Sequence, residues 1–136
     1  MGKPILCLDF DGVIHSYTSG WKRADVIPDP PVPGAADFII MAQHEFDVCI
    51  FSSRSHQPGG VEAMKLYIGR MLWDYYDDGD GLDIIQKAAV DEAIQSIKYP
   101  LNKPAAMITL DDRAVTFKGI WPSIESLKAF KPWNKI

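Results

Sequence analysis

Three short apolar runs, each followed at once by polar residues, set the pattern of this chain. The runs span residues 4–8, 46–51 and 105–110. A continuous apolar run of this length is typical of a strand buried on both faces of a parallel sheet. In open α/β sheets, ligands bind at the edge formed by the carboxyl ends of the strands. The pattern therefore predicts a parallel sheet with polar, chemistry-bearing side chains gathered at one edge.

Helical periodicity fills the intervals between and after these strands. Apolar residues recur at helical spacing in residues 34–44, 60–75, 84–97 and 122–130. The end of the third stretch, residues 93–99, fits a short strand equally well. The alternation of strands and helices predicts an α/β sandwich around a central, mostly parallel sheet.

Residues 13–32, which we call the flap, do not follow this alternation. The flap contains two short runs around Ser19-Gly20, and it closes with three prolines between residues 28 and 31. Short runs separated by turn residues are typical of a β-hairpin. We expect a two-stranded hairpin that protrudes after the first strand.

Composition and charge narrow the class of protein. The chain has 136 residues, of which 47% are hydrophobic and 24% charged, and this is the balance of one globular domain spanning residues 1–136. A formal net charge of −4 argues against coating nucleic acid by bulk electrostatics. No run approaches the roughly 20 apolar residues of a membrane span, and no targeting segment stands out, so we expect a cytoplasmic protein without a membrane partner.

Three further features leave alternatives open. Cys7 and Cys49 lie in apolar runs, as buried thiols of a reduced protein do, although the sequence leaves a disulfide between them open. The acidic segment 74–83 lacks the full ligand pattern of a calcium loop, and we interpret it as a solvated loop. The tail, residues 130–136, is apolar enough to dock on the core or on a partner, and the sequence favours neither.

Two aspartates stand two residues apart directly after the first apolar run, in the segment Asp9-Phe10-Asp11-Gly12-Val13. Carboxylates at alternate positions of an extended chain project to one side, and Gly12 permits a sharp turn. Close carboxylates repel, so such a pair usually binds a cation or keeps one member protonated. Either state suits catalysis, with a nucleophile beside a general acid and base. A polar strand end that caps a helix is the alternative for this motif alone.

The other strand ends add groups that suit phosphate and metal. Ser52 offers a hydroxyl and the backbone amides after it to a phosphate oxygen. Asp111 and Asp112 add carboxylates to an oxygen-ligand site of the kind that Mg²⁺ prefers. Lys103, before the third run, can neutralise a carboxylate and a phosphoryl group. Singly, each has an ordinary structural explanation, but together they predict a phosphate-handling site.

In this order, the motifs resemble those of the haloacid dehalogenase-like (HAD) superfamily of phosphotransferases. Its four motifs are matched by Asp9-Phe10-Asp11-Gly12-Val13, Ser52, Lys103 and Asp111-Asp112. The likeness covers residues 5–117. It implies a three-layer Rossmann-like sandwich of the minimal-cap type, in which the flap is a β-hairpin beside the active site.

The resemblance also implies a role for each residue. Asp9 would attack phosphorus and carry an aspartyl-phosphate, while Asp11 would protonate the leaving oxygen and then activate water. The implied Mg²⁺ ligands are Asp9, Asp11 through its backbone carbonyl, Asp111 and Asp112. The implied phosphate-binding residues are Ser52, Ser53, Arg54 and Lys103. An aspartate at position 11 is typical of the phosphatase branches and argues against dehalogenation.

The substrate is less closely defined than the chemistry. Residues 108–113 and Ser52-Ser53-Arg54 resemble the phosphatase part of phage polynucleotide kinase-phosphatases, although no P-loop is present, and this suggests a nucleotide or polynucleotide phosphate. Residues 21–23 combine a tryptophan with two cations that suit base stacking and phosphate contact, or a solvated hairpin tip. A minimal cap leaves the site open to a large substrate, or to a small one enclosed by a second subunit of a homo-oligomer.

The sequence therefore predicts an Mg²⁺-dependent phosphomonoesterase. The alternative is a non-catalytic phosphate-binding or regulatory module on the same fold. Presence of both Asp9 and Asp11 favours the enzyme.

Overall fold

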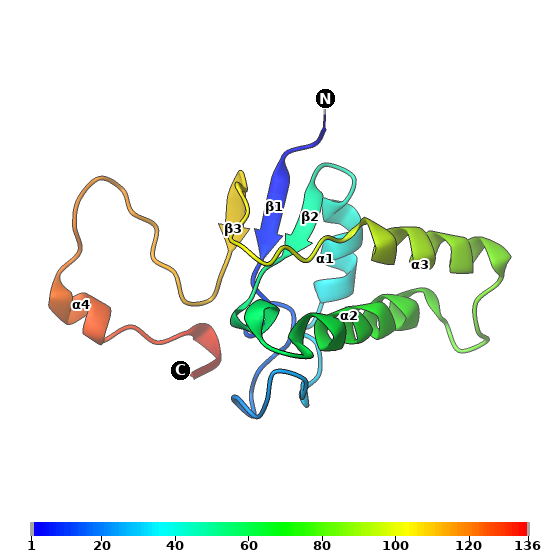
Figure 1. Cartoon of the computed structure of the whole chain (residues 1–136), viewed down its shortest axis with the longest axis horizontal. Helices are drawn as coiled ribbons and strands as arrows, with labels where there is room; N and C mark the ends of the chain where they lie inside the picture. The colour runs from blue at the N-terminus through cyan, green and yellow to red at the C-terminus, as the bar shows by residue number, and fades with distance from the viewer. Residues whose placement is uncertain (1, 136) are drawn as a thin grey trace.

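The chain forms a mixed α/β fold around a small parallel sheet, as a computed structural model shows for residues 2–135 (Figure 1). Its strands are β1 (Ile5–Leu8), β2 (Asp47–Ile50) and β3 (Ile108–Leu110), in the spatial order β2-β1-β3. The α-helices of the described residues are α1 (Ala35–Ala42), α2 (Gly60–Tyr76), α3 (Ile84–Ser96) and α4 (Ile124–Lys128). Two 3₁₀ helices, η1 (Ser53–His56) and η2 (Trp133–Lys135), follow β2 and α4.

The register of the sheet brings its three strand ends together. Leu8 pairs with Ile50 on one side and with Leu110 on the other, and both pairings are parallel. Backbone hydrogen bonds continue this alignment past the strands, from the Phe51 amide to the Leu8 carbonyl and from the Asp9 amide to the Leu110 carbonyl. The residues that follow β1, β2 and β3 are therefore neighbours, which confirms the predicted polar edge.

A single apolar core fixes this edge in place. Leu8 on β1, Ile50 on β2, Ile39 on α1 and Ile68 on α2 are almost completely buried in it. Burying each such side chain contributes about 1.5–3 kcal/mol. No helix within residues 2–135 combines the length and the apolar character needed to cross a bilayer.

The end of α3 resolves the ambiguity between helix and strand. The helix stops at Ser96, and the chain then runs beside β2, where Lys98 forms an isolated parallel bridge with Cys49. The Lys98 amide donates to the Val48 carbonyl, and the Ile50 amide donates to the Lys98 carbonyl. Both interpretations of residues 93–99 are thus partly correct.

The flap is a folded loop, and the two-stranded hairpin is not formed. Isolated bridges link His15 to Pro31 and Arg23 to Val26, without a continuous ladder between them. The pairing that is present lies at the prolines, where Pro31 is bridged to His15 and the Ser16 amide donates to the Pro30 carbonyl, and a proline has no N–H with which to extend the ladder.

The prediction that residues 105–110 form a strand buried on both faces is wrong. All three residues of β3 are exposed. The strand lies at one edge of the sheet, and the chain after it runs away from helices α1, α2 and α3 (Figure 1). An apolar run predicts burial, but it does not say whether the burial comes from the same chain.

The two cysteines are free, buried, and directly opposite each other on β1 and β2. Burial raises the pKa of the Cys7 thiol, and burial together with Cys7 raises the pKa of Cys49 to about 12. Thiols in this state are poor nucleophiles, so they act as small hydrophobic side chains.

Candidate functional site

Three carboxylates from the two ends of the sequence meet at the carboxyl edge of the sheet. Asp9 follows β1, and Asp111 and Asp112 follow β3. One carboxylate oxygen of each lies within 4.8 Å of one carboxylate oxygen of the others. More than one hundred residues of chain separate Asp9 from Asp111, and the pairing of β1 with β3 closes that gap.

Asp112 is the most constrained member of this cluster. Its side chain is only 2% exposed, and within residues 2–135 no amide, hydroxyl or basic group donates to either carboxylate oxygen, so the carboxyl proton of Asp9 is the one hydrogen-bond donor beside it. The nearest cation, the Arg113 guanidinium, is 3.9 Å from Oδ2 and largely exposed. A buried carboxylate without a donor is costly, so this group calls for a positive partner or a proton.

Gly12 makes room for Asp112. Its φ of +84° lies in the left-handed region, and a Cβ at this position would overlap Oδ2 of Asp112. The turn that begins there is closed by three amides, of Val13, Ile14 and His15, which all donate to the Phe10 carbonyl. Glycine is therefore required here for both conformation and space.

The cluster is electrostatically unfavourable without a cation. Burial, reinforced by the charges of Asp111 and Asp112, raises the pKa of Asp9 to about 8. Burial likewise raises the pKa of Asp112. Both shifts oppose ionisation, which is the expected behaviour of carboxylates crowded in a partly buried site.

Asp11 does not join the cluster, because Arg54 and His15 hold its carboxylate elsewhere. The Arg54 guanidinium donates from Nε to Oδ2 at 2.9 Å and from Nη2 to Oδ1 at 3.0 Å. His15 Nδ1 lies 2.8 Å from Oδ1. Burial works to raise the pKa of Asp11, but the hydrogen bonds from His15 and Arg54 outweigh it and hold that pKa below its usual value.

The partners of His15 define which of its ring nitrogens carries a proton. The backbone amide of Asp29 donates to Nε2 at 3.1 Å, so Nε2 is the unprotonated nitrogen of the neutral ring. The proton then resides on Nδ1 and is donated to Asp11. His15 is fully buried, and it connects Asp11 to the flap.

The Arg54 side chain links Asp11, at the carboxyl edge of the sheet, to the flap. It is fully buried, and its Nη1 donates to the backbone carbonyls of Arg23, Ala24 and Val26. The indole of Trp21 lies over the guanidinium at 4.6 Å. These contacts place Arg54 against Asp11 and the flap, and none of them supports the predicted contact with phosphate.

Ser52 and Ser53 lie next to Arg54, at the start of η1. The Ser52 hydroxyl accepts from the Arg54 amide at 3.1 Å, and the Ser52 amide donates to the Ser55 hydroxyl. Ser52 is buried and therefore caps η1, while its hydroxyl proton is donated to no group in the described chain. Ser53 is exposed.

Lys103 is not brought to the carboxylates. Its side chain is exposed, and it forms no ion pair with a carboxylate of residues 2–135. The nearest cationic side chain in sequence to the late acid pair is Arg113, whose amide also donates to Asp111 Oδ1 at 2.8 Å. Of the four motifs that resemble those of the HAD superfamily, the third motif, Lys103, therefore has the least support from the structure.

Two residues at this edge, His15 and Arg54, make more contacts with Asp11 and the flap than the sequence indicates. His15 has no motif of its own, and its four-residue spacing from Asp11 is the only signal. Arg54 follows a weak serine motif, and its burial depends on a flap 30 residues earlier in the chain. A buried arginine can be recognised only once the groups that pair with it are known.

The donor set fits a divalent cation that prefers oxygen ligands. Asp9, Asp111 and Asp112 present three carboxylates, and the donor beside buried Asp112 is the carboxyl group of Asp9. Mg²⁺ is commonly held by one or two carboxylates, waters and a substrate phosphate. Comparisons with protein-family models, with curated proteins and with solved structures found no match.

Proposed function

We propose that this protein is an Mg²⁺-dependent phosphomonoesterase of the HAD type, acting through an aspartyl-phosphate. The observation that carries the proposal is the meeting of Asp9 with Asp111 and Asp112, where Asp112 is buried with no donor beside it other than the carboxyl group of Asp9. A structural cluster of this kind would be expected to acquire basic partners within the fold. A cation-binding site needs the carboxylates to stay unpaired until the cation arrives.

In this proposal, Asp9, Asp111 and Asp112 hold the metal, which offsets negative charge on the carboxylates and on the transferring phosphoryl group. The side chain of Asp11 is not a metal ligand, because Arg54 and His15 occupy it. The family pattern uses the backbone carbonyl at this position instead.

The chemistry proceeds in two half-reactions. A carboxylate oxygen of Asp9 attacks phosphorus, the bond from phosphorus to the leaving oxygen breaks, and the leaving oxygen takes a proton delivered through Asp11. Water then attacks the aspartyl-phosphate while Asp11 takes its proton, and Asp9 and inorganic phosphate are released. For the first half, Asp11 must itself take up a proton from solvent and act as a carboxylic acid, because the neutral His15 ring would become an imidazolate if it gave up its Nδ1 proton.

The ionised state of Asp11 suits the second half directly. Hydrogen bonds from His15 and Arg54 hold the pKa of Asp11 low, so the carboxylate is ready to accept a proton from water. The Ser52 hydroxyl proton is donated to no group in the described chain and would serve a phosphoryl oxygen, with exposed Ser53 next to it. Lys103 belongs to the phosphate-binding set only through the resemblance, because its side chain is exposed and forms no ion pair with a carboxylate of the described residues.

The same proposal extends to the fold. The bridge between Lys98 and Cys49 adds a strand-like segment outside β2, which supports a wider Rossmann-like sheet of the three-layer type. The flap lies over the guanidinium of Arg54, as a minimal cap beside the site would.

The substrate class we propose is a nucleotide or polynucleotide phosphate. Trp21 and Arg23 of the flap are both partly exposed, beside the residues that contact Asp11. An exposed indole with a neighbouring cation suits stacking on a base and contact with its phosphate. Turnover of oligonucleotide ends no better than of a sugar phosphate would remove this part of the proposal.

Turnover of an aryl phosphate with and without Mg²⁺ tests the central proposal. We expect Mg²⁺-dependent hydrolysis that falls by at least about 10³-fold in Asp9→Asn, because the nucleophile is lost. Asp91→Asn, an exposed aspartate on α3, serves as the matched control and should keep full activity. Phosphate binding without turnover of any phosphomonoester by the wild-type chain would support the non-catalytic module instead.

A further inference from the structure

The last part of the chain is an apolar segment that its own fold leaves uncovered. We call residues 113–135 the arm. It leaves β3, passes through α4, and runs clear of helices α1, α2 and α3 (Figure 1). Its large hydrophobic side chains are exposed, and Ile120 and Trp121 at its middle are each 84% exposed. An apolar patch of this extent marks an interaction surface.

Both ends of the arm are fixed to the body of the chain. At its start, β3 pairs with β1 through Leu110. At its end, the Trp133 indole donates to the Gly12 carbonyl at 2.7 Å, and the side-chain Nδ2 of Asn134 donates to the Ser16 carbonyl at 3.0 Å. The exposed middle is thus a projecting loop with two anchored ends, and a partner can cover it without breaking these contacts.

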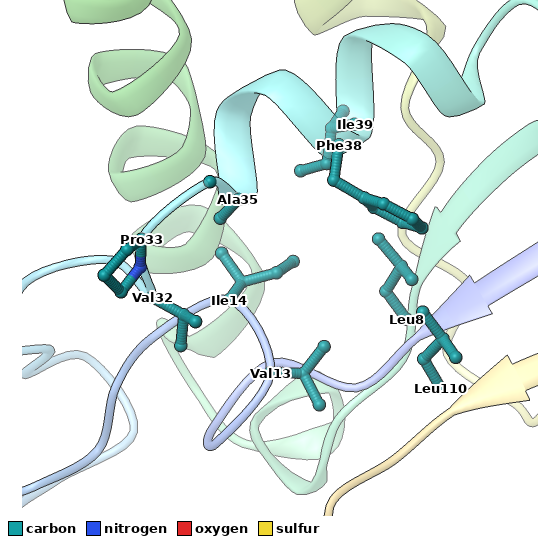
Figure 2. A pocket seen from close by; sticks show the side chains of 10 residues that line it. Leu8, Val13, Ile14, Val32, Pro33, Ala35, Phe38, Ile39 and Leu110 are labelled. Carbon is teal, nitrogen blue, oxygen red and sulfur yellow. The ribbon is translucent and has the colours of Figure 1, made fainter.

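An apolar groove lies at the root of the arm. Side chains from β1, β3, α1 and the flap, among them Leu8, Leu110, Phe38 and Val13, point into one hollow (Figure 2). Its volume is about 200 Å³, compared with the roughly 150 Å³ of an apolar cavity that accepts one benzene ring. The groove therefore has the size and the character to receive an aromatic or branched side chain.

The exposed area of the chain indicates how large the missing contact is. A compact monomer of 15.2 kDa exposes about 7,100 Å² by the scaling of surface with mass. This chain exposes 9040 Å², an excess of about 1,900 Å² over that scaling. A standard interface buries about 800 Å² on each partner, so the excess is enough for a stable dimer.

Charge favours a second copy of the same chain as the partner. The arm holds five basic residues and one glutamate, for a net charge of +4, whereas the rest of the chain holds nine basic and seventeen acidic residues, for a net charge of −8. A basic, apolar arm is complementary to the acidic body of another copy. Reciprocal exchange of two arms also forms a closed, two-fold symmetric interface.

We infer that two copies of this protein form a dimer in which the arm of each fills the groove of the other. The groove residue Phe38 (45% exposed) and the arm residue Ile120 then meet only across the interface. The inference is independent of the chemistry proposed at the carboxylate cluster.

Sedimentation of the full chain over a range of concentrations tests this inference. We expect a dimer for the wild type, and at least about a 30-fold weaker dimer for Phe38→Asp and for Ile120→Asp, because each buries a charge at the contact. Ile85→Asp is the matched control, since Ile85 on α3 is 80% exposed and lies outside the arm and the groove. A wild-type monomer, or an Ile85→Asp variant that is as weak as Ile120→Asp, would overturn the inference.

Mixing the two weakened variants separates exchange between chains from docking within one chain. The arm of Phe38→Asp and the groove of Ile120→Asp are both intact, so an equimolar mixture should form more dimer than either variant forms alone at the same total concentration. No recovery would overturn the inference. Circular dichroism verifies that each variant is folded, and Phe38→Ser with Trp121→Ser replaces any variant that is not.

Discussion

At the scale of single residues, the site depends on one buried carboxylate whose only neighbouring donor is another carboxyl group, that of Asp9. Asp112 is packed against Gly12, and its oxygens face other carboxylates. Such a group destabilises the cation-free fold, because its charge has lost water without gaining a partner. The same carboxylate favours binding of a cation. At this position, a lower stability of the cation-free fold therefore accompanies a higher affinity for the cation.

Gly12→Ala should disrupt this arrangement more than an equivalent change elsewhere. The alanine methyl would overlap Asp112 Oδ2 in addition to adopting a left-handed φ. Gly20→Ala is the matched control, because Gly20 has a φ of +74° with open space around it. We expect Gly20→Ala to cost about 1–2 kcal/mol, and Gly12→Ala to cost more and also to weaken Mg²⁺ binding.

Urea unfolding and Mg²⁺ titration of both variants measure these effects. Equal losses in the two variants, with Mg²⁺ affinity unchanged, would mean that the contact between residues 12 and 112 has no part in the metal site.

At the scale of elements, η1 connects the sheet edge to the flap. Ser52 and Ser55 close a capping box around its first turn, which fixes the backbone of Arg54. The Arg54 side chain then reaches Asp11 on one side and three flap carbonyls on the other. A 3₁₀ helix of four residues thereby positions both the carboxylate and the loop that covers it.

Arg54→Lys should separate a positioning role from a phosphate-binding role. Lysine keeps the charge but cannot make the forked contact with Asp11 and the three carbonyl contacts at once. We expect a loss of about 3 kcal/mol in unfolding free energy, because a buried ion pair is left incomplete.

Steady-state kinetics of the same variant distinguish the two roles. If Arg54 positions Asp11, kcat falls at least about tenfold while KM stays within about twofold. A raised KM with kcat retained would instead show that Arg54 contacts the phosphate, as the sequence predicts.

At the scale of the whole molecule, protonation of the carboxylate cluster affects global stability. The pKa of Asp9 is raised to about 8, whereas an unfolded aspartate has a pKa near 3.9. Between these values the folded chain holds a proton that the unfolded chain has released. The stability of the metal-free protein is therefore lost as pH rises toward 8.

Melting temperatures from pH 6 to 9 measure this effect. In a chelator, we expect the melting temperature to fall from pH 6 to about pH 8, where Asp9 becomes ionised in both states, and to fall further above pH 8 only as the buried thiols Cys7 and Cys49 oppose ionisation. Mg²⁺ should raise the melting temperature more at pH 8 than at pH 6, because metal binding requires the ionised carboxylates.

Asp9→Asn is the control for the pH dependence. It should flatten the profile in chelator and remove most of the Mg²⁺ effect. The low-pKa carboxylate Asp11 contributes only at acid pH, below this window, because its stabilisation is lost as pH falls. A wild-type profile in chelator that rises from pH 6 to 8 would contradict the raised pKa of Asp9.

The apolar runs and their polar ends predicted much of this fold. The strands and helices lie close to their expected residues, and Asp9 of the first acid pair meets Asp111 and Asp112 of the second, whereas Asp11 does not join them. The prediction that failed most clearly was burial of β3. An apolar run looks the same in the sequence whether its side chains are covered by the same chain or by another molecule. The predicted hairpin of the flap is represented only by isolated bridges, one of them between His15 and Pro31.

The sequence by itself determined the residue types at each strand end, because strand and turn patterns are local properties of the chain. Only the tertiary structure decided how those residues are shared. In the folded chain, Asp9 lies in the carboxylate cluster, whereas Asp11 is hydrogen-bonded to Arg54 and His15. Lys103 is exposed and contacts neither. The physical reason is that a carboxylate binds the charged or hydrogen-bonding groups that packing places next to it. Which groups those are depends on contacts between residues far apart in the sequence.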